Sequence, residues 1–370
     1  MHVAMDVRPV QAGFAGDRVY LENLVRRLRQ LPGISCISLY GESRLGEDVG
    51  LELGGKCRGR VFSARRGWLW TPWAVPRHLR LDAVDVYHAP YLIPVIAPCP
   101  TVVTIHDIGF RVLPEYYSQH KAHLRCALVG LSAHRAGAII TDSESSRADI
   151  ARVLRVGPGR IHVIPLAASE AFTPGDRDRA RRWVVESLGV DPPFVLAVGY
   201  ASARKNVARL IEAVEAVVRR RPGPLSLVIA GTPGDEPEGA LRSRFPSLGE
   251  RLVFTGGITE AALVDLYRAA DVFAFPSLYE GFGLPVLEAM ACGTPVVAAN
   301  SSSLPEVAGD AALLVDPGDV GALAEALERV LFGASLASDL VGRGLARAAQ
   351  FSWERTAELT HEVYRSVLDR

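Results

Sequence analysis

Short apolar runs alternate with longer amphipathic stretches along the whole chain. The runs are mostly continuous rather than alternately apolar and polar, which is typical of parallel strands buried on both faces. In the first half, we expect strands at residues 2–7, 34–40, 84–89, 101–107, 137–143 and 160–166. In the second half, we expect strands at residues 193–200, 225–231, 251–257, 271–277, 294–300 and 311–317.

Helical patterns fill the intervals, most clearly at residues 17–31, 207–221 and 259–270. The same alternation recurs in both halves, so the pattern predicts an α/β protein with two doubly wound domains. A polar stretch with Pro and Gly at 169–178 is the expected linker. The final residues, 351–370, have the pattern of an amphipathic helix beyond the last strand.

Composition supports this picture and excludes some functions. The 370 residues exceed what one core usually serves. Formal net charge is zero, so nothing global favours nucleic acid. The five cysteines form no CxxC pair, which indicates reduced thiols and a cytoplasmic protein. The N-terminus reads as a strand rather than a signal peptide, and no apolar run approaches the roughly 20 residues of a membrane span.

Residues 56–80 are the most biased segment, with seven Lys/Arg, three tryptophans and no acid. One interpretation is a surface for an anionic or lipid-linked acceptor, or for a membrane. The other is a helix whose Trp68, Trp70 and Trp73 pack inward while its arginines are solvated. We favour the second, because exposed basic faces are common.

Candidate binding residues follow the strands, since open α/β sheets bind ligands at the carboxyl ends of their strands. Gly13 and Gly16 lie in the first loop, before a helix N-terminus that would attract anions. The loop is not a dinucleotide fingerprint, which argues against hydride transfer. His106 and Asp107 follow the fourth run, where a histidine can orient a substrate or serve the structure. His88 is a weaker case of the same kind.

Arg204 and Lys205 lie in a short polar loop after the first strand of the second half. Adjacent cations there suit a diphosphate, although a solvated loop charge is the simpler alternative. Lys205 is one of only three lysines among 41 basic residues, which favours a specific need for an ammonium group.

The stretch EGFGLPVLE, residues 280–288, places two carboxylates around a Gly-Phe-Gly turn. Pro285 suits a first helical turn, so a helix should open at Leu284 with Glu288 within about its first turn. Glu280 precedes the helix, and the two acids should point to different places. Free backbone N–H groups near Phe282, Gly283 and Leu284 would face an anion or a sugar hydroxyl.

With these motifs, the chain resembles a GT-B fold retaining glycosyltransferase of family 4, also called group 1, in its bacterial mannosyltransferase-like branch. The resemblance covers essentially the whole chain. It rests on the Glu, seven residues, Glu motif at 280–288, on the run 254–319 around it, and on FSWERT at 351–356. It implies two Rossmann-like domains facing across a cleft. These would be an acceptor-side domain of 1–168 plus 352–370, and a nucleotide-sugar-binding domain of 169–351.

The resemblance also implies roles for the residues of the second half. Glu288 would hold the ribose hydroxyls of the nucleotide. Glu280, with the N–H groups of Phe282 and Gly283, would hold the hydroxyls of the transferred sugar, with Leu284 beside them. Arg204 and Lys205 would neutralise the leaving diphosphate. The base would be lined by residues around Gly257 and Ile258.

In the first half, the resemblance places His106 near the reaction centre, with Asp107 among the substrate-binding residues, and Gly16 near the diphosphate. Two departures from the family pattern stand out. Tyr200 follows Gly199 where the family often has arginine, so phosphate binding would depend more on Arg204 and Lys205. The AGFAGD loop also differs from the commoner GIGRY-type sequence, which leaves its role open.

We therefore expect retaining transfer of a hexose, with mannose from GDP-mannose as first choice, to a saccharide, lipid-linked or small-molecule acceptor. Two cations and a helix N-terminus would stabilise the leaving diphosphate, and no DxD-type metal site or cofactor is expected. UDP-, ADP- and dTDP-sugars remain alternatives, as do a sugar-nucleotide epimerase and a non-catalytic nucleotide-sugar-binding protein. A glycoside hydrolase fits less well, because its two carboxylates would face one bond. The location would be cytoplasmic, with peripheral membrane contact as an option.

Overall fold

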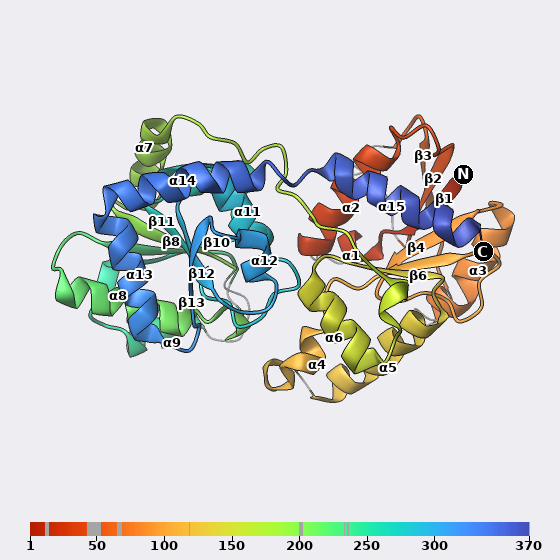
Figure 1. The fold of residues 1–370 in the computed structure, drawn as a ribbon, viewed down its shortest axis with the longest axis horizontal. Helices are drawn as coiled ribbons and strands as arrows, with labels where there is room; N and C mark the ends of the chain where they lie inside the picture. Colours follow the sequence, from red (N-terminus) through yellow and green to blue (C-terminus); the bar gives the residue numbers. More distant parts are fainter. Residues whose placement is uncertain are drawn as a thin grey trace. The chain divides into compact units, whose positions relative to one another are not determined.

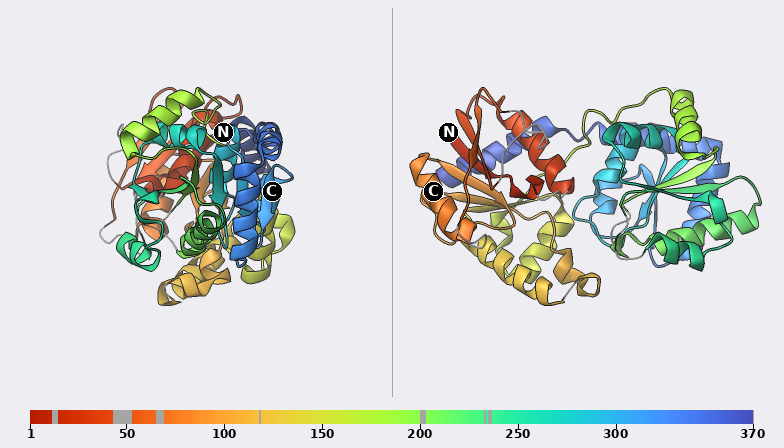
Figure 2. Two further views of the ribbon diagram at one scale, coloured as in Figure 1. Left: turned by 90° about the vertical axis from the view of Figure 1, so that its left-hand side faces the viewer. Right: turned by 180° about the vertical axis from the view of Figure 1, so that it is seen from behind.

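The chain forms two compact α/β units (Figure 1). The computed structural model describes residues 1–11, 15–42, 53–64, 69–117, 119–199, 203–232, 234 and 237–369. The first unit is Met1–Leu166 together with Ser352–Arg370, and the second is Ala167–Phe351. Each contains one parallel sheet between helices, which further views make plain (Figure 2), so the predicted fold class is confirmed.

The first sheet has seven parallel strands in the order β3-β2-β1-β4-β5-β6-β7. The order reverses between β1 and β4. The strands are β1 His2–Asp6, β2 Cys36–Gly41, β3 Cys57–Val61, β4 Val86–Pro90, β5 Thr101–Thr104, β6 Ala138–Thr141 and β7 Ile161–Val163.

The second sheet has six parallel strands in the order β10-β9-β8-β11-β12-β13. Its order reverses between β8 and β11, and such reversal points are where doubly wound sheets bind ligands. The strands are β8 Phe194–Val198, β9 Ser226–Ala230, β10 Leu252–Gly256, β11 Val272–Phe275, β12 Val296–Ala299 and β13 Ala312–Val315. All twelve predicted strands are therefore present.

Helices cover both faces of each sheet. In the first unit they are α1 Arg8–Gln11, α2 Ala15–Leu28, the π-helical turn η3 Trp70–Ala74, α3 Val75–Leu81, α4 Gly109–Val112, η4 Pro114–Tyr116, α5 Gln119–Arg135, α6 Glu144–Leu154, η5 Pro158–Arg160 and α15 Trp353–Leu368. In the second unit they are α7 Arg177–Leu188, η6 Ala203–Lys205, α8 Val207–Arg220, α9 Glu238–Arg244, η7 Gly249–Arg251, α10 Glu260–Ala269, α11 Leu284–Ala291, α12 Leu304–Ala308, α13 Val320–Phe332 and α14 Ala334–Ala348.

The segment 56–80 differs from the expected helix. Its first part is β3, an edge strand that pairs with β2 and in which Cys57 alone is buried. Arginines on an edge strand discourage pairing with another chain. Trp70 is buried, but Trp73 is 72% exposed, so the prediction that it packs inward is wrong. Trp68 lies outside the described residues.

The C-terminal helix α15 completes the first unit by packing against α2 and β6, as the family resemblance implied for residues 352–370. Its Tyr364 hydroxyl lies 2.6 Å from Nδ1 of the buried His88, whose Nε2 lies 2.7 Å from Thr104 Oγ1. Burial lowers the pKa of His88 to about 3, so this histidine is neutral. His88 thus serves the structure, holding the last helix to the sheet.

Candidate active site

The loop after β8 meets the loop after β11 at the reversal point of the second sheet. Gly199 ends the strand with φ +89°, and a Cβ there would lie 3.0 Å from Lys205 Cε. Glycine is needed for both reasons, since it tolerates positive φ and leaves room for the lysine. Asn206 follows in the left-handed region with φ 62°, and its Nδ2 donates to the carbonyls of Pro276 and Pro317.

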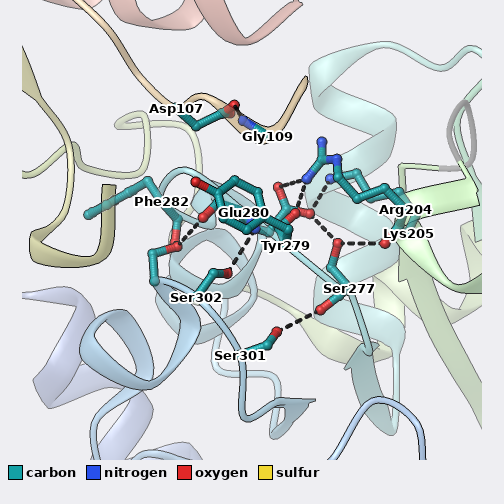
Figure 3. A network of polar contacts seen from close by, with 11 residues as sticks. Asp107, Gly109, Arg204, Lys205, Ser277, Tyr279, Glu280, Phe282, Ser301 and Ser302 are labelled. Carbon is teal, nitrogen blue, oxygen red and sulfur yellow. Dashed lines mark hydrogen bonds and ion pairs between the residues drawn. The ribbon is translucent and has the colours of Figure 1, made fainter. Parts of the chain in front are cut away.

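Arg204, Lys205 and Glu280 form one ion-pair cluster at this point (Figure 3). Lys205 Nζ lies 2.7 Å from Glu280 Oε1, and Arg204 Nη1 lies 2.9 Å from Glu280 Oε2. The Ser277 hydroxyl also donates to Glu280 Oε1. Burial alone would raise the pKa of this carboxyl, but the two cations and these hydrogen bonds lower the pKa to about 2. The cluster is therefore ionised, with a net positive charge.

Serines after β12 hold the EGFG turn in place. The Glu280 N–H donates to Ser302 Oγ at 2.8 Å, and Ser303 Oγ donates to the carbonyls of Glu280 and Phe282. Ser301 Oγ donates to the Ser277 carbonyl at 2.9 Å. The sequence reasoning missed these serines, although SSS directly follows a predicted strand at the same sheet edge. Their contacts fix the backbone around Glu280.

Gly283 is the N-cap of α11, with φ +113°. A Cβ there would lie 2.7 Å from Leu304 Cδ2. A larger residue would therefore be strained both by its positive φ and by this contact. As expected, the helix opens at Leu284 with Pro285 in its first turn. Phe282 is buried and packs edge-on against Phe351.

Glu288 points elsewhere, as the sequence predicted for the two acids. It is buried on α11, where the hydroxyl of Tyr267 on α10 donates to Glu288 Oε2 at 3.0 Å. Burial raises the pKa of Glu288 to about 7, although the hydrogen bond from Tyr267 opposes the change. Tyr267 was not predicted, because nothing local in the sequence links it to a residue 21 positions later.

Gly257 and Ile258 lie in the loop between β10 and α10, at the same sheet edge. The loops after β9 and β10 are joined by a hydrogen bond from Gly231 N to Gly256 O of 3.1 Å. Gly257 is exposed and Ile258 half-buried. The strand order puts this pair two strands beyond the Glu280 cluster.

His106 of the first unit is held between two carboxylates. Its Nδ1 lies 2.6 Å from Asp142 Oδ2, which follows β6, and its Nε2 lies 3.3 Å from Asp17 Oδ1 in the first turn of α2. Burial alone would lower the pKa of His106, but Asp142 and then Asp17 raise it well above its ordinary value. The two carboxylates thus favour the protonated, imidazolium form of the ring. Sequence reasoning found His106 and missed both acids, although Asp142 lies at the carboxyl end of a predicted strand, 137–143.

The other two described site candidates of the first unit are Asp107, which follows His106 in sequence, and Gly16, which precedes Asp17. Asp107 Oδ1 accepts a 2.7 Å hydrogen bond from the Gly109 N–H, which fixes the turn into α4. Gly16 lies in α2, and a Cβ there would meet nothing within 4 Å. Gly13 and Tyr200 lie outside the described residues. Within the described ranges, no cluster of three or more His, Cys, Asp or Glu side chains could hold a metal ion.

Both parallel sheets share the doubly wound strand order 3-2-1-4-5-6, and the first sheet adds a seventh strand, β7, at its end. The protein is therefore of the class with two Rossmann-like units, and its Arg-Lys-Glu cluster lies at the reversal point of one of them. Residues 15–172 match the Glycosyltransferase Family 4 family, and residues 182–344 match the Glycosyl transferases group 1 family. The chain belongs to these group 1, family 4 glycosyltransferases and has their GT-B fold. It is thus a glycosyltransferase of the hexosyltransferase type.

Among relatives, the chain is 35% identical to O-antigen chain mannosyltransferase B of Escherichia coli, over 71% of this chain and 70% of that protein. It is 32% identical to serotype-specific mannosyltransferase WbdA of Escherichia coli over 73% of this chain, but it spans only 34% of that protein. It also resembles the solved sucrose-phosphate synthase of Thermosynechococcus elongatus, with TM-score 0.78 and 25% identity over 100% of this chain and 99% of that one.

Proposed function

We propose that the protein transfers a mannosyl residue from GDP-mannose to a hydroxyl of a saccharide acceptor, with retention of configuration and without a metal. The observation that carries this is the Arg204-Lys205-Glu280 cluster at the reversal point of the second sheet. The mannosyltransferases among the relatives support the choice of sugar. The second unit would then bind the nucleotide sugar, and the first unit would serve the acceptor.

Lys205 and Arg204 would receive the diphosphate. When the bond from the sugar C1 to the diphosphate breaks, negative charge builds on the leaving phosphate oxygen. Fixed cations stabilise that charge without reorganising, which is how preorganised sites lower barriers. The acceptor oxygen would form the new bond to C1 on the same face, and the leaving diphosphate oxygen would take its proton.

Glu280 would hold the hydroxyls of the transferred sugar. Its pKa of about 2 keeps the carboxylate ionised, and an ionised carboxylate only accepts hydrogen bonds. Sugar hydroxyls would donate to it while the N–H groups of Phe282 and Gly283 supply donors from the turn. The same carboxylate fixes both cations, so it would align the sugar and the diphosphate relative to each other.

Glu288 would hold the ribose hydroxyls, with Gly257 and Ile258 beside the base. Because its pKa is about 7, we expect GDP affinity to rise about five- to tenfold between about pH 6 and pH 8, as the carboxylate ionises and accepts the ribose hydroxyls. Calorimetric titration with GDP at several pH values measures this. The Glu288→Gln variant should bind weakly with a flat pH profile. An equal slope in wild type and variant would refute the ribose role.

His106 would serve the first unit as a charged hydrogen-bond donor. Its imidazolium is held by Asp142 and Asp17, so its ring is oriented before any substrate arrives. We propose that it contacts the transferred sugar near the reacting carbon, with Gly16 and Asp107 contributing to the surrounding substrate site.

A thermal-shift panel of nucleotides tests the donor directly. We expect GDP and GDP-mannose to raise the melting temperature more than UDP, ADP or dTDP and their sugars. Stronger stabilisation by one of those others would overturn GDP-mannose as the donor. Incubation with GDP-mannose alone would separate the remaining classes. Epimerised donor would indicate an epimerase, and binding with neither transfer nor slow donor hydrolysis would indicate a non-catalytic binding protein.

A further inference from the structure

An exposed apolar patch lies on the first unit where η3 and α3 meet the loop between β4 and β5. We call it the Trp73 patch. Trp73 is 72% exposed and Ile96 is 73% exposed. They line one surface hollow with Pro72, Val95, Arg77 and Arg80. Large apolar groups gathered on a surface mark an interaction site more often than isolated ones do.

A second exposed apolar feature belongs to α5 on the same side of the sheet. Leu124, Leu128 and Leu131 repeat at the spacing of one helical face, and all three are exposed. Both α3 and α5 bury their other faces in one core, to which Leu79 and Val129 contribute. The loop that carries Val95 and Ile96 is tied to α5, because Ile93 N donates to Ser132 Oγ.

The segments that carry these two features are rich in basic residues. Segments 56–81, 86–106 and 116–141 together hold ten Lys/Arg and no Asp or Glu, in a chain with 41 of each sign. Arg77, Arg80 and Arg125 are exposed among them. Among the acids that directly flank these segments in sequence, Asp82 is buried and ion-paired with Arg60, Asp85 is exposed and accepts a hydrogen bond from the His2 N–H, and Glu115 is exposed in η4. The partner of this face therefore carries negative charge and accepts apolar side chains.

We propose that this face docks the enzyme peripherally on an anionic lipid bilayer. Tryptophan and aliphatic side chains enter the boundary between headgroups and acyl chains, while arginines meet the anionic headgroups. No helix among the described residues has the length and apolar character to cross a membrane, so the contact would be peripheral.

A second copy of the chain fits this face less well. A two-fold symmetric interface places the same patch on both subunits. The Arg77 and Arg80 side chains would then oppose their own copies without an exposed acid from 56–81, 86–106 or 116–141 to compensate. An anionic surface compensates them directly.

Co-sedimentation with vesicles tests the proposal without donor or acceptor, so its outcome is separate from that of the proposed function. We expect binding to phosphatidylcholine–phosphatidylglycerol vesicles, weaker binding at high salt, and little binding to phosphatidylcholine alone. Trp73→Ala/Ile96→Ala should lower the partition coefficient on the order of tenfold. Arg77→Ser/Arg80→Ser should lower it by a similar factor.

Matched controls come from the second unit. Phe332→Ala removes another exposed aromatic side chain, and Arg182→Ser/Arg219→Ser removes two other exposed arginines; both should bind vesicles like wild type. Circular dichroism confirms that each variant is folded. Equal binding with and without phosphatidylglycerol, or unchanged binding of both patch variants, would overturn the proposal. So would a dimer in sedimentation that dissociates on Trp73→Ala, since the patch would then be a protein interface.

Discussion

Lys205→Ala is expected to lower the transfer rate by about 10²- to 10³-fold. This is the range typical for removing one preorganised hydrogen-bond donor that stabilises charge in the transition state. The variant leaves the buried Glu280 paired with Arg204 alone, so the cluster loses its net positive charge. GDP should therefore bind about tenfold more weakly as well. Initial rates with GDP-mannose and calorimetry with GDP measure the two effects.

The variant Glu280→Gln tests the proposed binding of the sugar separately from the proposed binding of the diphosphate. It removes the negative charge that faces both cations, so GDP affinity should hold or increase. Transfer should still fall by about 10²-fold or more, because the carboxylate that we propose accepts the sugar hydroxyls is gone.

Two matched variants control for these substitutions. Lys56→Ala removes another lysine, whose Nζ contacts Leu31 O in the first unit, and should leave the rate unchanged. Glu250→Gln does the same for an exposed glutamate. Transfer within about twofold of wild type in both Lys205→Ala and Glu280→Gln would contradict the proposed site.

Asp142→Asn is expected to lower the pKa of His106 and to reduce the free energy of unfolding by about 3–5 kcal/mol. The variant removes one partner of a buried ion pair, which costs more than losing an exposed pair. Because the folded-state pKa of His106 is raised, its stabilising contribution is fully present below the unfolded value of about 6.5. It is lost as the pH rises through the raised folded-state pKa.

The difference in unfolding free energy between wild type and Asp142→Asn should therefore shrink toward alkaline pH. Urea titrations across pH measure it, and NMR of the His106 ring reports the pKa itself. Asp17→Asn serves as a graded comparison with a smaller expected pKa change, because Asp17 lies at 3.3 Å rather than 2.6 Å. An unchanged His106 pKa in Asp142→Asn would show that this pair does not set the charge.

The sequence predicted the interior of the fold because buried parallel strands are continuous apolar runs. β11 and β12 are buried along their whole length, and both were expected. β3 was missed because an edge strand need not be apolar, and CRGRV reads as solvated polar chain. Trp73 was misplaced for a related reason, since composition does not tell which tryptophan of a cluster faces inward.

The residues of the candidate site also fall into those that the sequence predicts and those that depend on tertiary packing. Arg204, Lys205 and Glu280 follow predicted strands, so the strand-end rule found them before the structure brought them together. Tyr267 lies within a helix and contacts Glu288 through tertiary packing that no local pattern encodes. Asp142 lies at the end of a predicted strand and Ser302 follows another, but short polar residues at such positions are also ordinary turn formers. Which of them meets a site residue depends on the fold.

The position of helix α15 in the sequence determines the order in which the two units can fold during synthesis. Residues 1–166 of the first unit leave the ribosome before the second unit, yet the core of the first unit lacks Tyr364 until the second unit has been synthesised. Until then, His88 and the face of α2 that α15 covers would be open to water. The second unit is continuous in sequence and can fold first. The first unit would thus mature after the second, although most of it is translated earlier, and a nascent chain stalled before α15 would be a ready substrate for chaperones or proteases.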